Sequence, residues 1–138
     1  MREIREVIFR GKRANNGEWV EGDLLQTRYH SGHIEYQIMP QTPVSSAVPV
    51  LPETIGQFTG LADKNGVRIF EGDICRFKRF NDIHVGEIVF NVTTASFVMR
   101  YQSIVGAYGE KATQKMLLSV CDDIEVVGNI RDNPELLR

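Results

Sequence analysis

Hydrophobic and polar residues alternate along much of this chain with a period of two. The clearest example is residues 34–39, where Ile34, Tyr36 and Ile38 alternate with more polar neighbours. Such alternation is typical of a strand that buries one face. We therefore expect a mostly β protein built from short strands and hairpins. The other runs that predict strands are residues 4–13, 18–25, 54–61, 67–77, 85–91, 96–101 and 124–130.

Two Asn-Gly pairs stand between these runs and predict β-hairpins. Asn16-Gly17 separates the first two runs, and Asn65-Gly66 follows the run that ends at Leu61. A type I′ turn needs two successive residues that tolerate positive φ, and Asn-Gly meets this requirement best. We expect a hairpin at each pair.

Two segments near the C-terminus carry helical signals. Residues 110–118 are compatible with a short helix or with entry into a strand, and the sequence leaves both open. Asn133, Pro134 and Glu135 provide an N-cap, a proline at the first helical position and a carboxylate near the positive end of a helix. A short helical turn is expected there.

Four of the five prolines lie between Pro40 and Pro52. Because proline lacks a backbone N–H, we expect no regular hydrogen-bond ladder in this stretch, which is either an ordered crossover or a linker. If the chain has two modules, they are residues 1–53 and 54–138; otherwise the chain forms one compact unit. Many short strands joined by Gly and Asn turns lead us to expect a small, strongly bent SH3-like barrel in the second half.

The composition narrows the class of protein. Hydrophobic residues make up 42% of the 138 residues and charged residues 25%, which is typical of a folded globular chain. The net charge of -2 gives no overall attraction to nucleic acid or to an anionic membrane. No apolar run approaches the roughly 20 residues that span a bilayer, and the first residues do not resemble a secretory signal. We expect no membrane association and a cytoplasmic location.

The acidic residues suggest turns more than catalysis. An enzyme reading requires Asp73, Asp122 and Asp123 to converge with a histidine in one pocket. For Glu71-Gly72-Asp73, a tight turn is the simpler interpretation, with glycine at positive φ and aspartate accepting backbone N–H groups. We expect no catalytic residues and no enzyme.

The potential metal ligands are also better explained without a metal. His30 and His33 stand in a polar loop, far from both cysteines. Cys75 and Cys121 are each set among apolar residues, which predicts buried free thiols, although the sequence leaves one disulfide open. We expect no metal site and no cofactor.

One basic stretch carries the nucleic-acid alternative. On a strand, Arg76, Lys78 and Phe80 share one face, where cations can draw phosphates and an aromatic ring can stack on a base. Arg10, Lys12 and Arg13 extend this surface if the hairpins lie side by side. The competing interpretation is an amphipathic strand with its Phe77 side in the core. Trp19, the only tryptophan, is expected to be a core anchor.

Three parts of the chain carry a distinctive combination of motifs. The central part has Ile55-Gly56-Gln57-Phe58-Thr59-Gly60-Leu61, then Asp63-Lys64-Asn65-Gly66 and Ile69-Phe70-Glu71-Gly72-Asp73-Ile74. The other two parts are the opening residues 8–13, 17–20 and 22–24 and the closing residues 126–130 and 133–137. All three resemble the YopX family of phage and prophage proteins. The resemblance implies a phage or prophage setting in a bacterial host. It brings no enzymatic activity, cofactor or catalytic residue with it.

These observations lead to an accessory protein that acts by interaction. The first hypothesis is a non-enzymatic module that binds an unknown protein partner or assembles with itself as a homo-oligomer, because small β folds leave edges and patches for partners. The alternative is a nucleic-acid-binding accessory protein. An enzyme is the third hypothesis and the least favoured.

Overall fold

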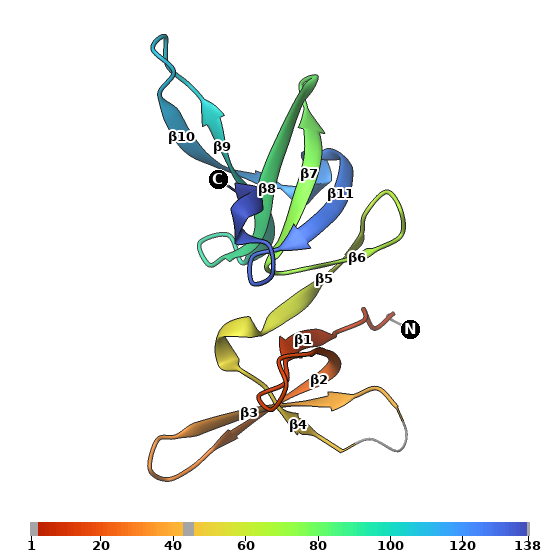
Figure 1. Ribbon diagram of the computed structural model, residues 1–138. Coiled ribbons are helices and arrows are strands. Elements are labelled where there is room, and N and C mark those ends of the chain that lie inside the picture. Colours follow the sequence, from red (N-terminus) through yellow and green to blue (C-terminus); the bar gives the residue numbers. More distant parts are fainter. Residues whose placement is uncertain (1–2, 43–45, 138) are drawn as a thin grey trace. The chain divides into compact units, whose positions relative to one another are not determined.

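The computed structural model describes residues 3–42 and 46–137. The chain divides into two units, one that ends at Gly60 and one that begins at Leu61 (Figure 1). Strands pair antiparallel throughout, and each helical segment among the described residues is a single 3-10 turn. The prediction of a mostly β protein is confirmed. Whether the units are separate folding domains, expected with a boundary near residue 53, stays a prediction.

The first unit is built on an antiparallel sheet in the order β4-β3-β2-β1-β5-β6, of which the last strand, β6 (Arg68–Phe70), comes after Gly60 in the chain. The strands follow the predicted alternation because each turns one set of side chains inward. Val20, Ile38 and Val50 form its buried centre, and Phe9, Leu24, Tyr36, Val48 and Ile55 pack around them. The elements are β1 (Phe9–Lys12), β2 (Trp19–Arg28), β3 (Ile34–Pro40), β4 (Val48–Pro49), the turn η1 (Pro52–Thr54) and β5 (Gly56–Ala62), which continues past Gly60.

The hairpin between β1 and β2 is confirmed, but its turn is not the predicted type I′. Only Gly17 has a positive φ, of 73°, whereas Asn16 does not. The Asn16 side chain instead accepts the N–H of Glu18 at 2.9 Å. The second Asn-Gly pair behaves in the same way, with positive φ at Gly66 alone. The backbone N–H groups are therefore accepted by the Asn16 side chain in the first turn and by the Asp63 side chain in the second, and glycine supplies the unusual backbone angle in both.

The proline-rich stretch is more regular than the sequence predicts. Residues 43–45 lie outside the described part of the chain. Beyond them, β4 pairs with β3, and the Val50 N–H donates to the Tyr36 carbonyl at 3.2 Å. The expectation that this stretch forms no ladder is wrong for β4, because its proline occupies a strand at the edge of the sheet, where a missing N–H is tolerated.

The second unit is a five-stranded antiparallel sheet in the order β10-β9-β8-β7-β11. This sheet is open, with β10 and β11 as its two edges, so the SH3-like barrel is not confirmed. Two of its strands, β8 and β9, have ten and nine residues, which is longer than expected. The elements are β6 (Arg68–Phe70), β7 (Asp73–Arg79), β8 (Asp82–Asn91), β9 (Ser96–Ile104), β10 (Lys111–Leu117), η2 (Leu118–Val120), β11 (Asp122–Asn129) and η3 (Pro134–Leu137).

The core of the second unit lies against one face of this sheet. Its buried residues come from β6, β7, β8, β9 and the η2 turn: Ile69, Cys75, Phe77, Ile88, Met99, Tyr101, Leu118 and Cys121. The opposite face of β9 and β10 presents mainly polar side chains, as the alternating exposure of β10 illustrates.

The structure decides the one ambiguous C-terminal segment and shows the expected helical turn. Residues 111–117 form a strand, β10, which pairs with β9 over its whole length. The expected terminal helical turn is present as η3, where the Leu136 N–H donates to the Asn133 carbonyl at 3.1 Å. No helix among the described residues is long and apolar enough to cross a membrane.

Candidate functional site

The basic stretch of β7 is only partly arranged as predicted. Arg76 and Lys78 are exposed on one side of the strand, and Phe77 between them is 1% exposed in the core. Phe80, however, lies beyond the strand, in the β7–β8 turn, with a φ of 51°. Its ring is 77% exposed and stacks under the Arg79 guanidinium at 3.9 Å. The prediction that Phe80 shares the strand face of Arg76 and Lys78 is wrong because the chain turns before it.

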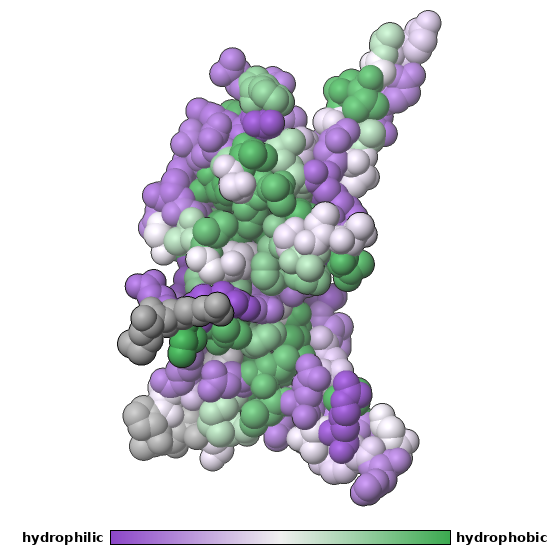
Figure 2. All heavy atoms as spheres, turned by 180° about the vertical axis from the view of Figure 1, so that it is seen from behind, coloured by the Kyte–Doolittle hydropathy of each residue, from purple (hydrophilic) through white to green (hydrophobic). Residues whose placement is uncertain are grey.

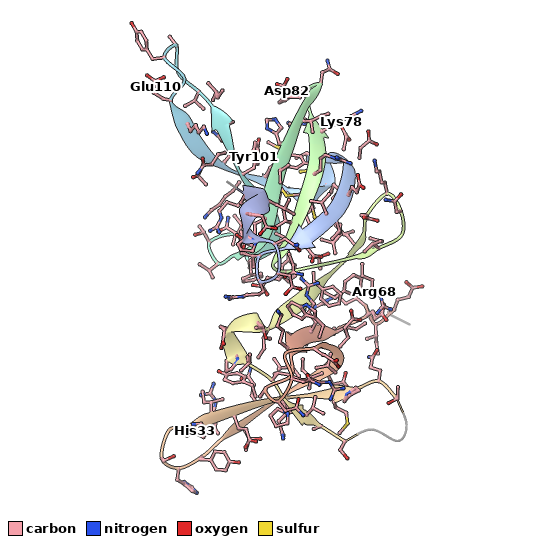
Figure 3. All side chains as sticks on the ribbon, viewed as in Figure 1. His33, Arg68, Lys78, Asp82, Tyr101 and Glu110 are labelled. Carbon is pink, nitrogen blue, oxygen red and sulfur yellow. The ribbon has the colours of Figure 1, made fainter. Side chains whose placement is uncertain are left out.

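Carboxylates of β11 accompany the two β7 cations. Arg76 forms an ion pair with Glu125, and Lys78 Nζ lies 3.5 Å from Asp123 (Lys78 is labelled in Figure 3). The hydrogen bond from Arg76 holds the pKa of Glu125 below its ordinary value. Such half-exposed pairs contribute little to stability, but they offset the positive charge of this face. A phosphate would have to compete with carboxylates that are already in place.

Two of the three basic residues singled out in the first unit, Arg10 and Lys12, lie against Trp19. The Arg10 guanidinium carbon lies 4.9 Å from the centroid of the Trp19 ring, and Lys12 Nζ lies 5.3 Å from it. Trp19 is half-buried and belongs to this cation stack, so the prediction of a core anchor is wrong. Arg13 forms a backbone bridge with Val50. These residues belong to a different unit from β7, and a surface joining the two sets stays a prediction.

The acidic residues singled out above have separate structural roles. Gly72 has a φ of 92°, and buried Asp73 accepts the Phe70 N–H at 2.7 Å, which confirms the tight turn. Asp123 pairs with Lys78, as described. His84 packs between aromatic rings, with centroids 5.5 Å from Phe77 and 4.8 Å from Tyr101. The described residues include no group of three His, Cys, Asp or Glu side chains that could hold a metal ion.

His33 and the two cysteines also have structural surroundings. His33 lies at the β2–β3 turn, where it is exposed and stacks on Tyr29 with ring centroids 5.8 Å apart (Figure 3). Cys75 and Cys121 are buried free thiols, as predicted. Burial is the main cause that raises the pKa of the Cys121 thiol to about 11; nearby Arg79 lowers it and Asp122 raises it further. The neutral thiol is a poor nucleophile.

The most distinctive surface of the described chain is the β9–β10 hairpin. Its outer part, residues 100–115, projects beyond the rest of the second unit and is called the arm below (Figure 1). The arm ends in a hydrogen-bonded loop, in which the Val105 N–H donates to the Glu110 carbonyl at 2.9 Å. Three large apolar side chains of this end are exposed: Ile104 is 70% exposed, Val105 59% and Tyr108 94%. Figure 2 shows hydrophobic residues standing among hydrophilic ones on the projecting hairpin.

A groove lies on the outer face of the arm, where the arm borders β8 and η3. It has a volume of about 630 Å³, its floor is formed by strands β8, β9 and β10, and η3 contributes one wall. Its aliphatic groups are Val85, Ile104, Leu136 and Leu137, and its charged groups are Arg100, Glu87 and Lys111. Arg100 and Glu87 form an ion pair at 2.8 Å. The groove therefore combines an apolar wall with a cationic side.

Sequence reasoning missed the arm and the groove. The signal that was present is the run Ile104-Val105-Gly106-Ala107-Tyr108, where large apolar residues stand in a glycine-containing loop instead of a strand. A loop of this kind has no core to enter, so its apolar side chains must remain exposed or meet a partner. The groove gave no signal, because its walls come from segments that are distant in sequence.

The comparisons with known proteins place the chain in a family. A family model described as "YopX protein" matches residues 8–138, which is nearly the whole chain. No curated protein matches. Among solved structures, the crystal structure of protein EF1440 from Enterococcus faecalis is similar, with 24% identity, a TM-score of 0.45, and coverage of 96% of this chain and 99% of that chain.

Proposed function

The chain belongs to the YopX family, and from that premise we propose that it is a non-enzymatic interaction module that binds another protein or a second copy of itself. The resemblance noted in the sequence adds the setting of the proposal, which is an accessory role for a phage or prophage in the cytoplasm of its bacterial host.

The observation that carries the proposal is the exposed apolar end of the arm. Tyr108 is 94% exposed and Ile104 is 70% exposed. Tyrosine is enriched at the energetic centres of protein interfaces because its large ring buries much area with little loss of side-chain entropy. An arm that holds such side chains away from its own core is suited to bury them against a partner.

The charge distribution on β7 supports protein binding over nucleic-acid binding. Arg76 and Lys78 face Glu125 and Asp123, so a phosphate backbone would meet carboxylates beside each cation. Affinity for nucleic acid comes mainly from cations that neutralise phosphates and release counterions. Cations that are already paired with carboxylates contribute less to the affinity for nucleic acid.

The proposal is tested by affinity purification of the tagged chain from cells that carry its own prophage. Each lysate is divided, one half is treated with nuclease, and co-purifying proteins are identified by mass spectrometry. A Tyr108→Ser bait is run in parallel, with Val92→Ser as the control, since Val92 is 82% exposed in another loop of the same unit. We expect protein bound to the wild-type and Val92→Ser baits, resistant to nuclease and depleted from Tyr108→Ser. Partners that disappear on nuclease treatment would contradict the proposal.

Nucleic-acid binding remains the second candidate because of one feature, the exposed Phe80 ring with Arg79 above it. Paired aromatic and guanidinium groups are the usual platform for stacking single-stranded bases. On this alternative, Phe80→Ala weakens binding of a labelled single-stranded oligonucleotide roughly tenfold, in line with the loss of one stacked base. If the leading proposal is right, neither the wild-type chain nor Phe80→Ala binds the oligonucleotide measurably in the same anisotropy titration.

A further inference from the structure

We infer that the arm and groove are self-complementary, so that the arm of one copy of this chain docks in the groove of a second copy and reciprocally. The inference rests on the proposed function and specifies its partner and its surface. Every residue that it uses lies in the second unit. It assigns a binding role to the β9–β10 hairpin that neither the family nor the sequence motifs indicate.

Apolar groups are matched between the two surfaces. The arm offers the side chains of Val105 and Tyr108, which are 59% and 94% exposed. The groove offers Val85, Leu136 and Leu137, each 39% exposed and all lining the same hollow. Both sets lose exposed apolar area when the end of one arm occupies the groove of the other copy. Burial of apolar area is the main driving force for association of this kind.

Charged groups are matched in the same way. Glu110 lies at the far end of the arm, where Figure 3 labels it, and the Tyr108 N–H donates to its carboxylate at 3.2 Å. In the groove Arg100 is already paired with Glu87, and Lys111 is the further cation of its lining. Docking an arm into the groove brings the carboxylate of one copy toward the Lys111 ammonium of the other. Complementary charges of this kind fix the register of an interface.

The strand register is compatible with a two-fold contact. Ile104 of β9 is directly opposite Lys111 of β10, and this pair lies between the end of the arm and the middle of the groove. If two arms lie antiparallel with their outer faces together, a two-fold axis just beyond this pair, between Glu110 and Lys111, carries each arm end to the partner's groove. Glu110 of one copy then faces Lys111 of the other, and Ile104, which is 70% exposed, is covered by the arm end of the other copy. A two-fold contact repeats each interaction twice and closes as a dimer.

The alternative of joining two β10 edges into one longer sheet is disfavoured by the edge itself. The strand carries Lys111 and Lys115 within its seven residues. Lysines on an edge strand are a common protection against edge-to-edge pairing, because each must keep its ammonium group in water. The apolar groups of the arm and groove lie on the loop and on the outer face, so the contact uses faces and not edges.

The test is the oligomeric state of the full chain, measured by sedimentation equilibrium across a range of protein concentrations. We expect a reversible dimer for wild type and for Val92→Ser. We expect Tyr108→Ser to raise the dimer dissociation constant by about ten- to thirtyfold, the usual effect of truncating a central aromatic residue. Circular dichroism checks that each variant keeps its fold.

A charge exchange supplies the specific readout. Glu110→Lys and Lys111→Glu each place like charges across the two-fold contact and are expected to favour monomer. The double variant Glu110→Lys/Lys111→Glu restores opposite charges and is expected to restore the dimer. An interface elsewhere on the chain predicts no such rescue, so a dimer unaffected by the single variants, or a double variant that stays monomeric, would overturn the inference.

The outcome also separates this inference from the proposed function. A wild-type chain that is monomeric at every concentration, but captures another protein through Tyr108 in the purification above, overturns the second-copy inference and leaves the interaction module standing. A monomeric chain that captures no nuclease-resistant protein overturns both.

Discussion

Asp63 is a residue whose ionised form is held by the fold. Burial by itself raises the pKa of its carboxyl, but backbone N–H groups of Val126, Val67 and Asn65 donate to it and hold the pKa below the ordinary value of 3.8. The three donor distances are 2.9, 2.9 and 2.8 Å. One side chain therefore ties the turn before β6 to strand β11.

We predict that Asp63→Asn lowers the free energy of unfolding at neutral pH by about 1.5–3 kcal/mol, the usual range for hydrogen bonds to a charged group. The lowered pKa means that the wild-type contribution is present above pH 3.8 and is lost as pH falls through the folded-state pKa. Urea unfolding at several pH values should show this acid dependence weakened in Asp63→Asn. Exposed Asp82 provides the control, and an equal loss in Asp82→Asn would contradict the prediction.

Cys121 has the opposite behaviour, because its neutral form is the one favoured by the fold. With a pKa of about 11, about one thiol in a thousand is ionised at pH 8. We predict that neither cysteine reacts with iodoacetamide at pH 8 in the native protein and that both react in urea, as measured by mass spectrometry. The stabilisation is complete below pH 9 and is lost as pH rises toward 11. Rapid native alkylation of Cys121 would refute the assignment.

At the scale of elements, glycines in the sheets set how closely strands approach. A Cβ added at Gly22 of β2 would lie 1.9 Å from the Met39 carbonyl oxygen of β3, so the backbone itself would have to move. A Cβ at Gly11 of β1 would instead meet the Ile38 and Val50 side chains at 3.3 Å. A side chain at position 22 would therefore displace backbone, whereas one at position 11 would displace only side chains. Both positions belong to the first unit.

We predict that Gly22→Ala destabilises the first unit by about 3 kcal/mol or more, at the upper end of overpacking effects, and that Gly11→Ala costs less than half as much. The measurement is urea unfolding followed by the fluorescence of Trp19, the single tryptophan of the chain. Equal effects of the two substitutions would show that the β2–β3 pairing is looser than its register implies.

At the scale of the whole molecule, the two units provide separate probes of their own unfolding. Trp19 belongs to the first unit, and both cysteines belong to the second. Tertiary contacts concentrate inside each unit, which has its own hydrophobic cluster. Separate cores are the physical condition under which domains unfold separately.

We therefore predict two unfolding transitions that do not coincide, one reported by Trp19 fluorescence and one by thiol exposure. Gly22→Ala should move the fluorescence transition and leave the thiol transition in place. Gly86→Ala, where a Cβ would lie 2.7 Å from the Arg100 carbonyl oxygen, should do the reverse. Coincident transitions that shift together in both variants would show a single cooperative unit.

The sequence by itself determined the local features of this protein. Alternation at residues 34–39 specified β3, Gly17 and Gly66 marked both hairpins, and Asn133 with Pro134 marked η3, because each of these depends on backbone angles and neighbouring side chains. The burial of Cys75 and Phe77 followed from the same period of two. These features depend on residues that are adjacent in the sequence, so they can be predicted from it.

Only the tertiary structure decided which distant residues meet. The carboxylates that offset Arg76 and Lys78 come from β11, more than forty residues away, and their register depends on the β7–β11 pairing. The groove joins β8 to η3 and β10, and the open sheet leaves the arm uncovered. Strand order depends on the total burial of the folded unit, which no local pattern contains; for that reason the sequence predicted the strands but not the surface they create.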